Sequence, residues 1–109
     1  MSKFAAIQYK PPKGQPQIAI VELSTLIKEA CEAGAKIIVC PEMATTGYIW
    51  DSPEQILPHA ETADGPLFQC LSSLSNQYGV WIVCGYAERE GQELYNSALV
   101  LRPDGTLAC

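Results

Sequence analysis

One continuous apolar run constrains this chain more than any other feature. Residues 37–40 read Ile-Ile-Val-Cys, and they lead directly into Pro41 and Glu42. A strand that is apolar on both faces is typical of the centre of a parallel sheet that helices cover. Pro41 lacks a backbone donor, so it ends the pairing of that strand. The run therefore predicts a buried strand that brings a carboxylate to the edge of a sheet.

The residues before this run predict a parallel crossover. A short strand is expected over 3–9, followed by a loop that contains three prolines and Gly14. From about Gln17 to Gly34 apolar residues recur at helical spacing, namely Ile20, Leu23, Ile27, Ala30 and Cys31. A strand, a helix and a strand within about 40 residues indicate a βαβ unit with a parallel sheet.

The second half of the chain predicts one more helix and three further strands. Asp64-Gly65-Pro66 opens the helix, with Asp64 as its cap, and Gly79 ends it. Strands are expected over 80–86 and 94–101, with a hairpin loop over 88–93, a turn over 102–105 and a fifth strand from Thr106; a short helix is expected near 54–57. The predicted order is β-α-β-α-β-β-β in one α/β domain over residues 1–109. Two helices are thin cover for five strands, which favours the front part of a larger domain.

Composition excludes several classes of function. The 109 residues are 48% apolar and carry a net charge of −5, and the seven basic residues are scattered. Nucleic acid is not an expected partner, because neutralising phosphates requires clustered positive charge. The start of the chain lacks the apolar core of a signal peptide, and no run approaches the length of a membrane span. We therefore expect a cytoplasmic protein that handles small molecules, with no membrane partner.

The cysteines and the single histidine do not predict a metal site. The five cysteines lie at long, irregular spacings without a CxxC pair. They are interpreted as reduced core residues. His59 has no metal-binding or catalytic partner in the sequence and is interpreted as a surface residue. No metal or cofactor is expected.

Glu42 is the strongest catalytic candidate. In parallel sheets, ligands bind beyond the carboxyl ends of the strands, and Glu42 lies two residues past the buried run. A partly dehydrated carboxylate tends toward a raised pKa and can act as a general base. Thr46, Tyr48 and Trp50 follow in the same loop and are candidates for shaping a substrate pocket. The alternatives are a solvated Glu42 and aromatic residues that only fill space under the loop.

Several stretches together resemble the nitrilase superfamily, the carbon–nitrogen hydrolases. They are the opening strand that ends in Gln8, AGAKIIVCPE, VCPEMATTGY, YGVWIVCGYAE and LYNSALVLRPDGTL. The resemblance covers essentially all 109 residues. It implies that the chain supplies the N-terminal part of a four-layer α-β-β-α sandwich.

The resemblance also implies a chemistry. The family works with a Glu as general base and acid, a Lys that stabilises negative charge, and a Cys that attacks an amide or nitrile carbon to form a thioester. Only Glu42 matches this set. The Lys is expected a few residues past the strand that begins at Thr106 and the Cys later still, so the domain is expected to be truncated before both. Cys40, two residues from Glu42, is interpreted as a core residue and not as the nucleophile.

Two classes of function remain open at this point. The first is the N-terminal segment of an enzyme that cleaves a small amide or nitrile, inactive in isolation, whose parent protein is expected to be a homo-oligomer. The second is a non-catalytic α/β module that binds a ligand or partner, because two of the three catalytic groups are absent. The sequence does not distinguish an amide from a nitrile substrate.

Overall fold

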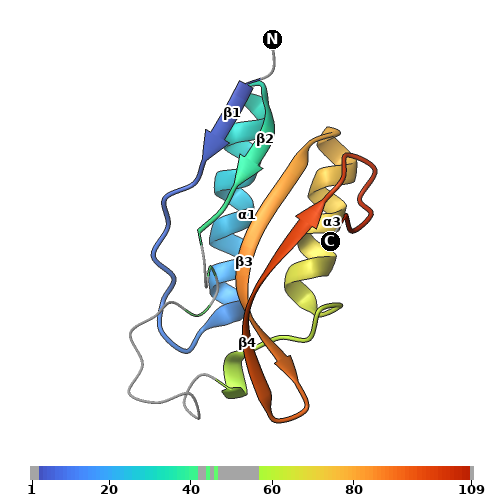
Figure 1. Cartoon of the computed structure of the whole chain (residues 1–109). Helices are drawn as coiled ribbons and strands as arrows, with labels where there is room; N and C mark the ends of the chain where they lie inside the picture. The colour runs from blue at the N-terminus through green and yellow to red at the C-terminus, as the bar shows by residue number, and fades with distance from the viewer. Residues whose placement is uncertain (1–2, 42–43, 45, 47–56, 109) are drawn as a thin grey trace.

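The computed structural model describes residues 3–41, 44, 46 and 57–108, and its frame is one four-stranded sheet. The strands are β1 (Lys3–Ala6), β2 (Ala35–Val39), β3 (Trp81–Glu90) and β4 (Glu93–Leu101), and they lie side by side in that order. β1 pairs with β2 and β2 with β3 in parallel, whereas β3 and β4 form an antiparallel hairpin (Figure 1). The predicted α/β class and parallel crossover are confirmed.

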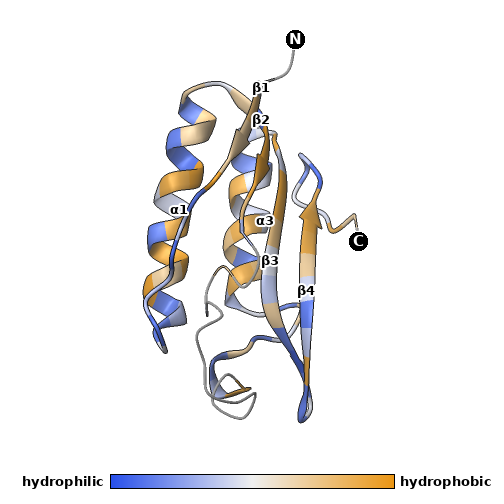
Figure 2. Cartoon of the chain, turned by 60° about the vertical axis from the view of Figure 1, so that its left-hand side comes forward, coloured by the Kyte–Doolittle hydropathy of each residue, from blue (hydrophilic) through white to orange (hydrophobic). Residues whose placement is uncertain are grey.

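Two helices cover one face of this sheet. α1 (Pro16–Glu32) and α3 (Pro66–Tyr78) lie on the same side of the strands in both views (Figures 1 and 2), and a short 3-10 helix, η1 (Leu57–His59), precedes α3. α1 ends just before Gly34, as predicted. Within the described ranges, neither helix is both long and apolar enough to cross a membrane.

The core lies between this helix pair and the sheet. Its buried residues come from the apolar stripes of α1 and α3 and from alternate positions of β2, β3 and β4, and they include Leu23, Ile27, Ile38, Leu67, Leu71, Ile82, Cys84, Tyr86, Leu99 and Leu101. Successive strand residues point to opposite faces, so only one residue in two of each strand reaches this core.

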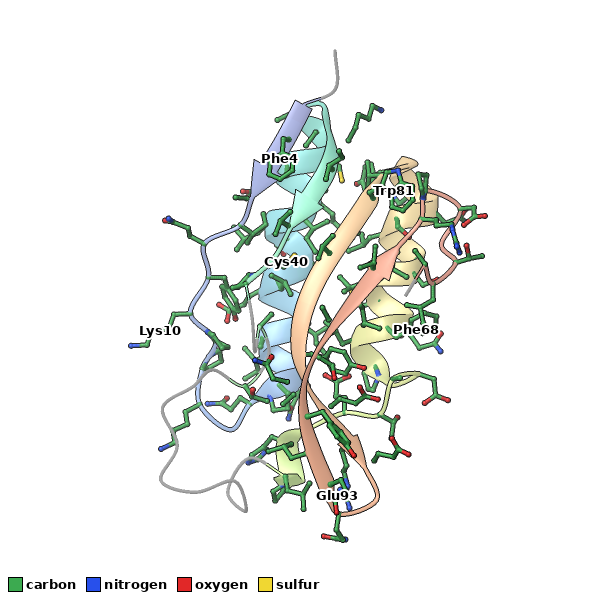
Figure 3. The ribbon with its side chains drawn as sticks, in the orientation of Figure 1. Phe4, Lys10, Cys40, Phe68, Trp81 and Glu93 are labelled. Carbon is green, nitrogen blue, oxygen red and sulfur yellow. The ribbon has the colours of Figure 1, made fainter. Side chains whose placement is uncertain are left out.

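The opposite face of the sheet has no layer over it in the described part of the chain. Phe4, Ile37 and Trp81 are paired across β1, β2 and β3, and Phe4 is 65% and Trp81 40% exposed. Figure 3 shows these two aromatic residues at the same end of the sheet. Val39 pairs with Val83 in the next row on this face, and both are only half-buried. The sequence predicted that β2 is buried on both faces. In the described part of the chain, the middle of β2 is fully buried on the helix-covered face and only partly buried on the other.

The N-terminus of α3 is held by Glu61 and not by Asp64. The cap position is Gly65, which makes no side-chain cap bond, so the predicted Asp64 cap is wrong. Instead the Leu67 amide donates to Glu61 Oε1 at 2.7 Å, and Asp64 accepts a bond from the Thr62 hydroxyl. The carboxylate reaches the helix from six residues upstream, a distance that no local capping pattern signals.

The hairpin is longer than predicted, and the last strand is shorter. β3 continues to Glu90 and β4 begins at Glu93, so most of the predicted loop over 88–93 is paired strand. Cross-strand pairing overrides the polar composition that suggested a loop. Past the turn, Leu107 forms only an isolated bridge with Leu101, so the fifth strand predicted from Thr106 is reduced to one bridge among the described residues.

The turn after β4 packs directly on α3. Gly105 has a φ of 87° and its carbonyl accepts a 2.7 Å bond from the Ser72 hydroxyl. A Cβ at this position would lie 2.9 Å from the Ser72 carbonyl oxygen. The turn therefore requires glycine both for its backbone conformation and for its close approach to the helix.

Replacing Glu61 with Ala should destabilise the fold by about 1–2 kcal/mol, because an amide at the positive end of α3 loses its charged acceptor. Glu61→Gln keeps one acceptor oxygen and should lose less. Urea unfolding followed by circular dichroism measures both. Glu93→Ala, at the exposed start of β4, is the matched control and should change the free energy by less than about 0.5 kcal/mol. Equal effects at the two positions would contradict the capping role.

Gly105→Ala should cost more than Gly79→Ala. Both positions have positive φ, 87° and 64°, so each substitution carries about 1–2 kcal/mol of left-handed strain. Only Gly105 has the close contact with Ser72, whereas nothing lies within 4 Å of the added methyl at Gly79. Overpacking should add roughly 1–3 kcal/mol at Gly105. Free energies of unfolding from urea titrations would show the difference, and equal values would exclude the steric contribution.

Candidate active site

The carboxyl ends of β1, β2 and β3 lie toward the same end of the sheet, because these strands are parallel. Past the end of β2 the chain stays attached to β3. The Cys40 amide donates to the Val83 carbonyl at 2.7 Å, and the Ala44 amide donates to the Gly85 carbonyl at 3.0 Å. These two anchored residues lie on either side of Glu42, which is itself outside the described residues.

Of the three predicted substrate-binding residues, the structure describes only one. Thr46 is buried, with 2% of its surface exposed, and Ala44 beside it is fully buried. Tyr48 and Trp50 lie outside the described residues. The roles of Glu42, Thr46, Tyr48 and Trp50 therefore stay predictions.

The chain returns to the same strand at residue 61. The Glu61 amide donates to the Ala87 carbonyl at 3.0 Å, and the Arg89 amide donates to the Glu61 carbonyl at 2.7 Å. Ala44, before the 47–56 segment, and Glu61, after it, are thus bonded to alternate residues of β3. A segment whose flanking residues are bonded to one strand is a suitable carrier of site residues.

A polar group lies where β3 and β4 extend toward this end, and the sequence did not reveal it. The Ser97 hydroxyl donates to Glu88 Oε1 at 2.7 Å, and Tyr86 lies opposite Ser97 in the hairpin register. Burial, together with the charge and hydrogen bond of Glu88 and a smaller effect of Glu61, raises the pKa of Tyr86 to about 12. Only the antiparallel register brings Tyr86, Glu88 and Ser97 together.

A surface hollow of about 450 Å³ opens between the N-terminal ends of the two helices. Pro16, Gln17 and Ile20 of α1 form one wall, and the 58–62 segment, Pro66 and Arg89 form the rest. His59 lines this surface hollow and is half-buried.

The described cysteines are free thiols. Cys40 is 5% and Cys84 0% exposed, and both belong to the core, as predicted for Cys40. Cys31 in α1 and Cys70 in α3 are partly buried, and burial is the main cause that raises the pKa of each. Among the described residues, no group of three or more His, Cys, Asp or Glu side chains is placed to hold a metal ion.

Comparisons with known proteins agree with this geometry. Residues 3–109 match the carbon-nitrogen hydrolase family. The chain is 37% identical to a nitrilase of Pyrococcus abyssi over 106 residues, covering 96% of this chain and 40% of the relative. It is also 37% identical to the protein N-terminal amidase of Saccharomyces cerevisiae over 109 residues, covering 94% of this chain and 24% of the relative.

Solved structures give the same result for the fold. A crystal structure of an N-terminal amidase superposes with a TM-score of 0.81 at 33% identity, covering 95% of this chain and 26% of that one. An amidase from Nesterenkonia sp. is similar in fold, with a TM-score of 0.80 at 22% identity, over 99% of this chain and 41% of that one. The chain thus spans less than half the length of these relatives. On the match over residues 3–109, the chain belongs to the carbon–nitrogen hydrolase family.

Proposed function

We propose that this chain is the N-terminal part of the catalytic domain of an enzyme that hydrolyses a small amide or nitrile, with Glu42 as its general base. The observation that carries the proposal is the placement of this position within the matched family region, between two residues bonded to β3 at the carboxyl ends of parallel strands. Ligand sites in parallel sheets lie at this end.

In the proposed mechanism a cysteine thiolate attacks the amide or nitrile carbon. For an amide, Glu42 removes the thiol proton, then donates a proton to the departing ammonia or amine, and finally activates the water that cleaves the thioester. For a nitrile, the attack gives a thioimidate, and a first water must add to it before ammonia departs and the thioester forms. A lysine stabilises the negative charge that develops on the substrate. We propose that polypeptide beyond residue 109 supplies the lysine and the cysteine, in keeping with relatives of more than twice this length.

The substrate side of the proposal rests on the loop after Glu42. Thr46, Tyr48 and Trp50 would shape the pocket, with the buried Thr46 acting from within its wall. Because the relatives include a nitrilase and a protein N-terminal amidase, both nitriles and amides remain candidate substrates in this proposal. The proposed complete protein is a cytoplasmic homo-oligomer that acts on a small molecule without a metal or cofactor and has no nucleic-acid or membrane partner.

The open face of the sheet supports a partial domain. Phe4 and Trp81 expose apolar surface in a row across three strands, and the proposed sandwich would bury this row under a second sheet. The same surface is what favours the second candidate, a non-catalytic module that docks on a partner. The two candidates differ in whether activity appears once the remaining polypeptide is present.

In the complete enzyme, Glu42→Gln should lower kcat/KM by about 10²–10⁴-fold, because the amide cannot transfer protons. Ammonia release from a panel of small amides, nitriles and peptides with N-terminal Asn or Gln measures the effect. Glu29→Gln, on the exposed side of α1, is the matched control and should leave kcat/KM unchanged. Activity of the Glu42→Gln enzyme within a few-fold of the unsubstituted enzyme would remove Glu42 from the mechanism.

The 109-residue chain alone should release no ammonia from the same panel, because the proposed nucleophile is outside it. A coupled glutamate dehydrogenase assay at high protein concentration would detect slow turnover. Release that Glu42→Gln abolishes would show that these residues suffice for catalysis, and the proposed division of the catalytic groups would be wrong.

A further inference from the structure

Two core thiols face each other across the strands that frame the candidate site. Ile38 pairs with Ile82 and Val39 with Val83 in the parallel register of β2 and β3. The Cys40 amide bond to the Val83 carbonyl continues this ladder by one residue. Cys40 and Cys84 are therefore neighbours on adjacent strands, and both point to the helix-covered face with Ile38 and Ile82. Figure 3 places Cys40 just past the end of β2, beside β3.

The spacing of this pair suits a covalent bond. Adjacent strands lie about 4.8 Å apart, and the Cα atoms of disulfide-bonded cysteines usually lie about 4.4–6.8 Å apart. The Cys84 thiol lies within hydrogen-bonding reach of Cys40 and also points toward its neighbouring Gly85 carbonyl, at 3.6 Å. No large backbone movement is needed to bring the two sulfur atoms together.

We propose that Cys40 and Cys84 are a redox-sensitive pair that peroxide converts into a reversible disulfide between β2 and β3. Cys40, at the strand end and 5% exposed, reacts first. Its sulfur attacks one peroxide oxygen, the O–O bond breaks, and the thiol proton leaves with the released oxygen as water. The Cys84 sulfur then attacks the Cys40 sulfenic acid and displaces a second water. Two thiols lose two electrons and two protons, and one peroxide becomes two waters.

The environment of Cys84 assigns it the second step. Its hydrogen bond with Cys40 and its burial raise its pKa well above the usual value, so it remains a protonated thiol at neutral pH. Cys84 is fully buried whereas Cys40 is 5% exposed, so the first attack by a small oxidant falls to Cys40.

The bond would act next to Glu42. Cys40 precedes Glu42 by two residues, and Ala44 on the other side is bonded to Gly85, the residue after Cys84. A disulfide would tie the chain covalently to β3 at Cys40, two residues before Glu42. This consequence rests on the proposed function, whereas formation of the bond does not.

Exposure of the folded 109-residue chain to hydrogen peroxide, followed by maleimide labelling in denaturant and intact-mass measurement, tests the pair. The expected product loses the mass of two hydrogens, takes up two fewer maleimides and returns to full labelling after dithiothreitol. Cleavage after glutamate and then after aromatic residues separates the peptide over 33–42 from those that carry Cys70 and Cys84. The bond should join 33–42 to the peptide that contains Cys84.

Matched variants separate this pair from its neighbours. Cys40→Ala and Cys84→Ala should each abolish the loss of two labels, whereas Cys31→Ala and Cys70→Ala should retain it. Peptide mapping of the unsubstituted chain gives the answer even where a variant folds poorly. A bond that involves Cys70, oxygen addition without a bond, or full labelling under conditions that oxidise the urea-unfolded chain would each overturn the proposal. None of these measurements depends on hydrolase activity.

Discussion

The backbone ladder along β3 is the interaction on which the rest of the structure depends. β3 pairs with β2 through Ile37–Val39, then receives the amides of Cys40 and Ala44, and further along exchanges two bonds with Glu61. Its other edge is paired with β4 over the whole hairpin. One strand therefore holds the residues on both sides of Glu42 and the return of the chain toward α3. Backbone bonds to one strand therefore fix the described residues that flank the candidate site.

The helix layer makes this ladder rigid from one side. Buried side chains of α1 and α3 fill the space over Ile38, Ile82 and Cys84, and Glu61 joins the end of the ladder to the first turn of α3. The turn at Gly105 adds a contact on the same helix. The other face of the sheet carries apolar side chains such as Phe4 and Trp81 without a covering layer in the described residues. This asymmetry, together with relatives of more than twice the length, is the basis for the proposed second sheet over this face.

The proposed general base, Glu42, and the proposed redox-sensitive thiol, Cys40, are two residues apart in the sequence, just after β2. The position proposed as the general base follows β2, and the thiol pair that we propose as a peroxide target links β2 to β3 just before it. The first proposal rests on the carboxyl ends of parallel strands, and the second rests on the short distance between adjacent strands. The sequence separates Cys40 from Cys84 by a helix and a long loop, so the pair is visible only in the folded chain.

The sequence by itself determined the elements that depend on local patterns. The apolar run at 37–40 predicts a central strand, the spacing of Leu23 and Ile27 predicts α1, and Pro41 and Gly79 predict where elements end. The family resemblance quoted from these stretches was confirmed, while the role of Glu42 stays a proposal. Only the tertiary structure decided the Glu61 cap, the extended hairpin, the single bridge at Leu107 and the Cys40–Cys84 pair. These features depend on register and on packing between distant segments, and a one-dimensional pattern carries no information on which residues of two strands lie opposite each other.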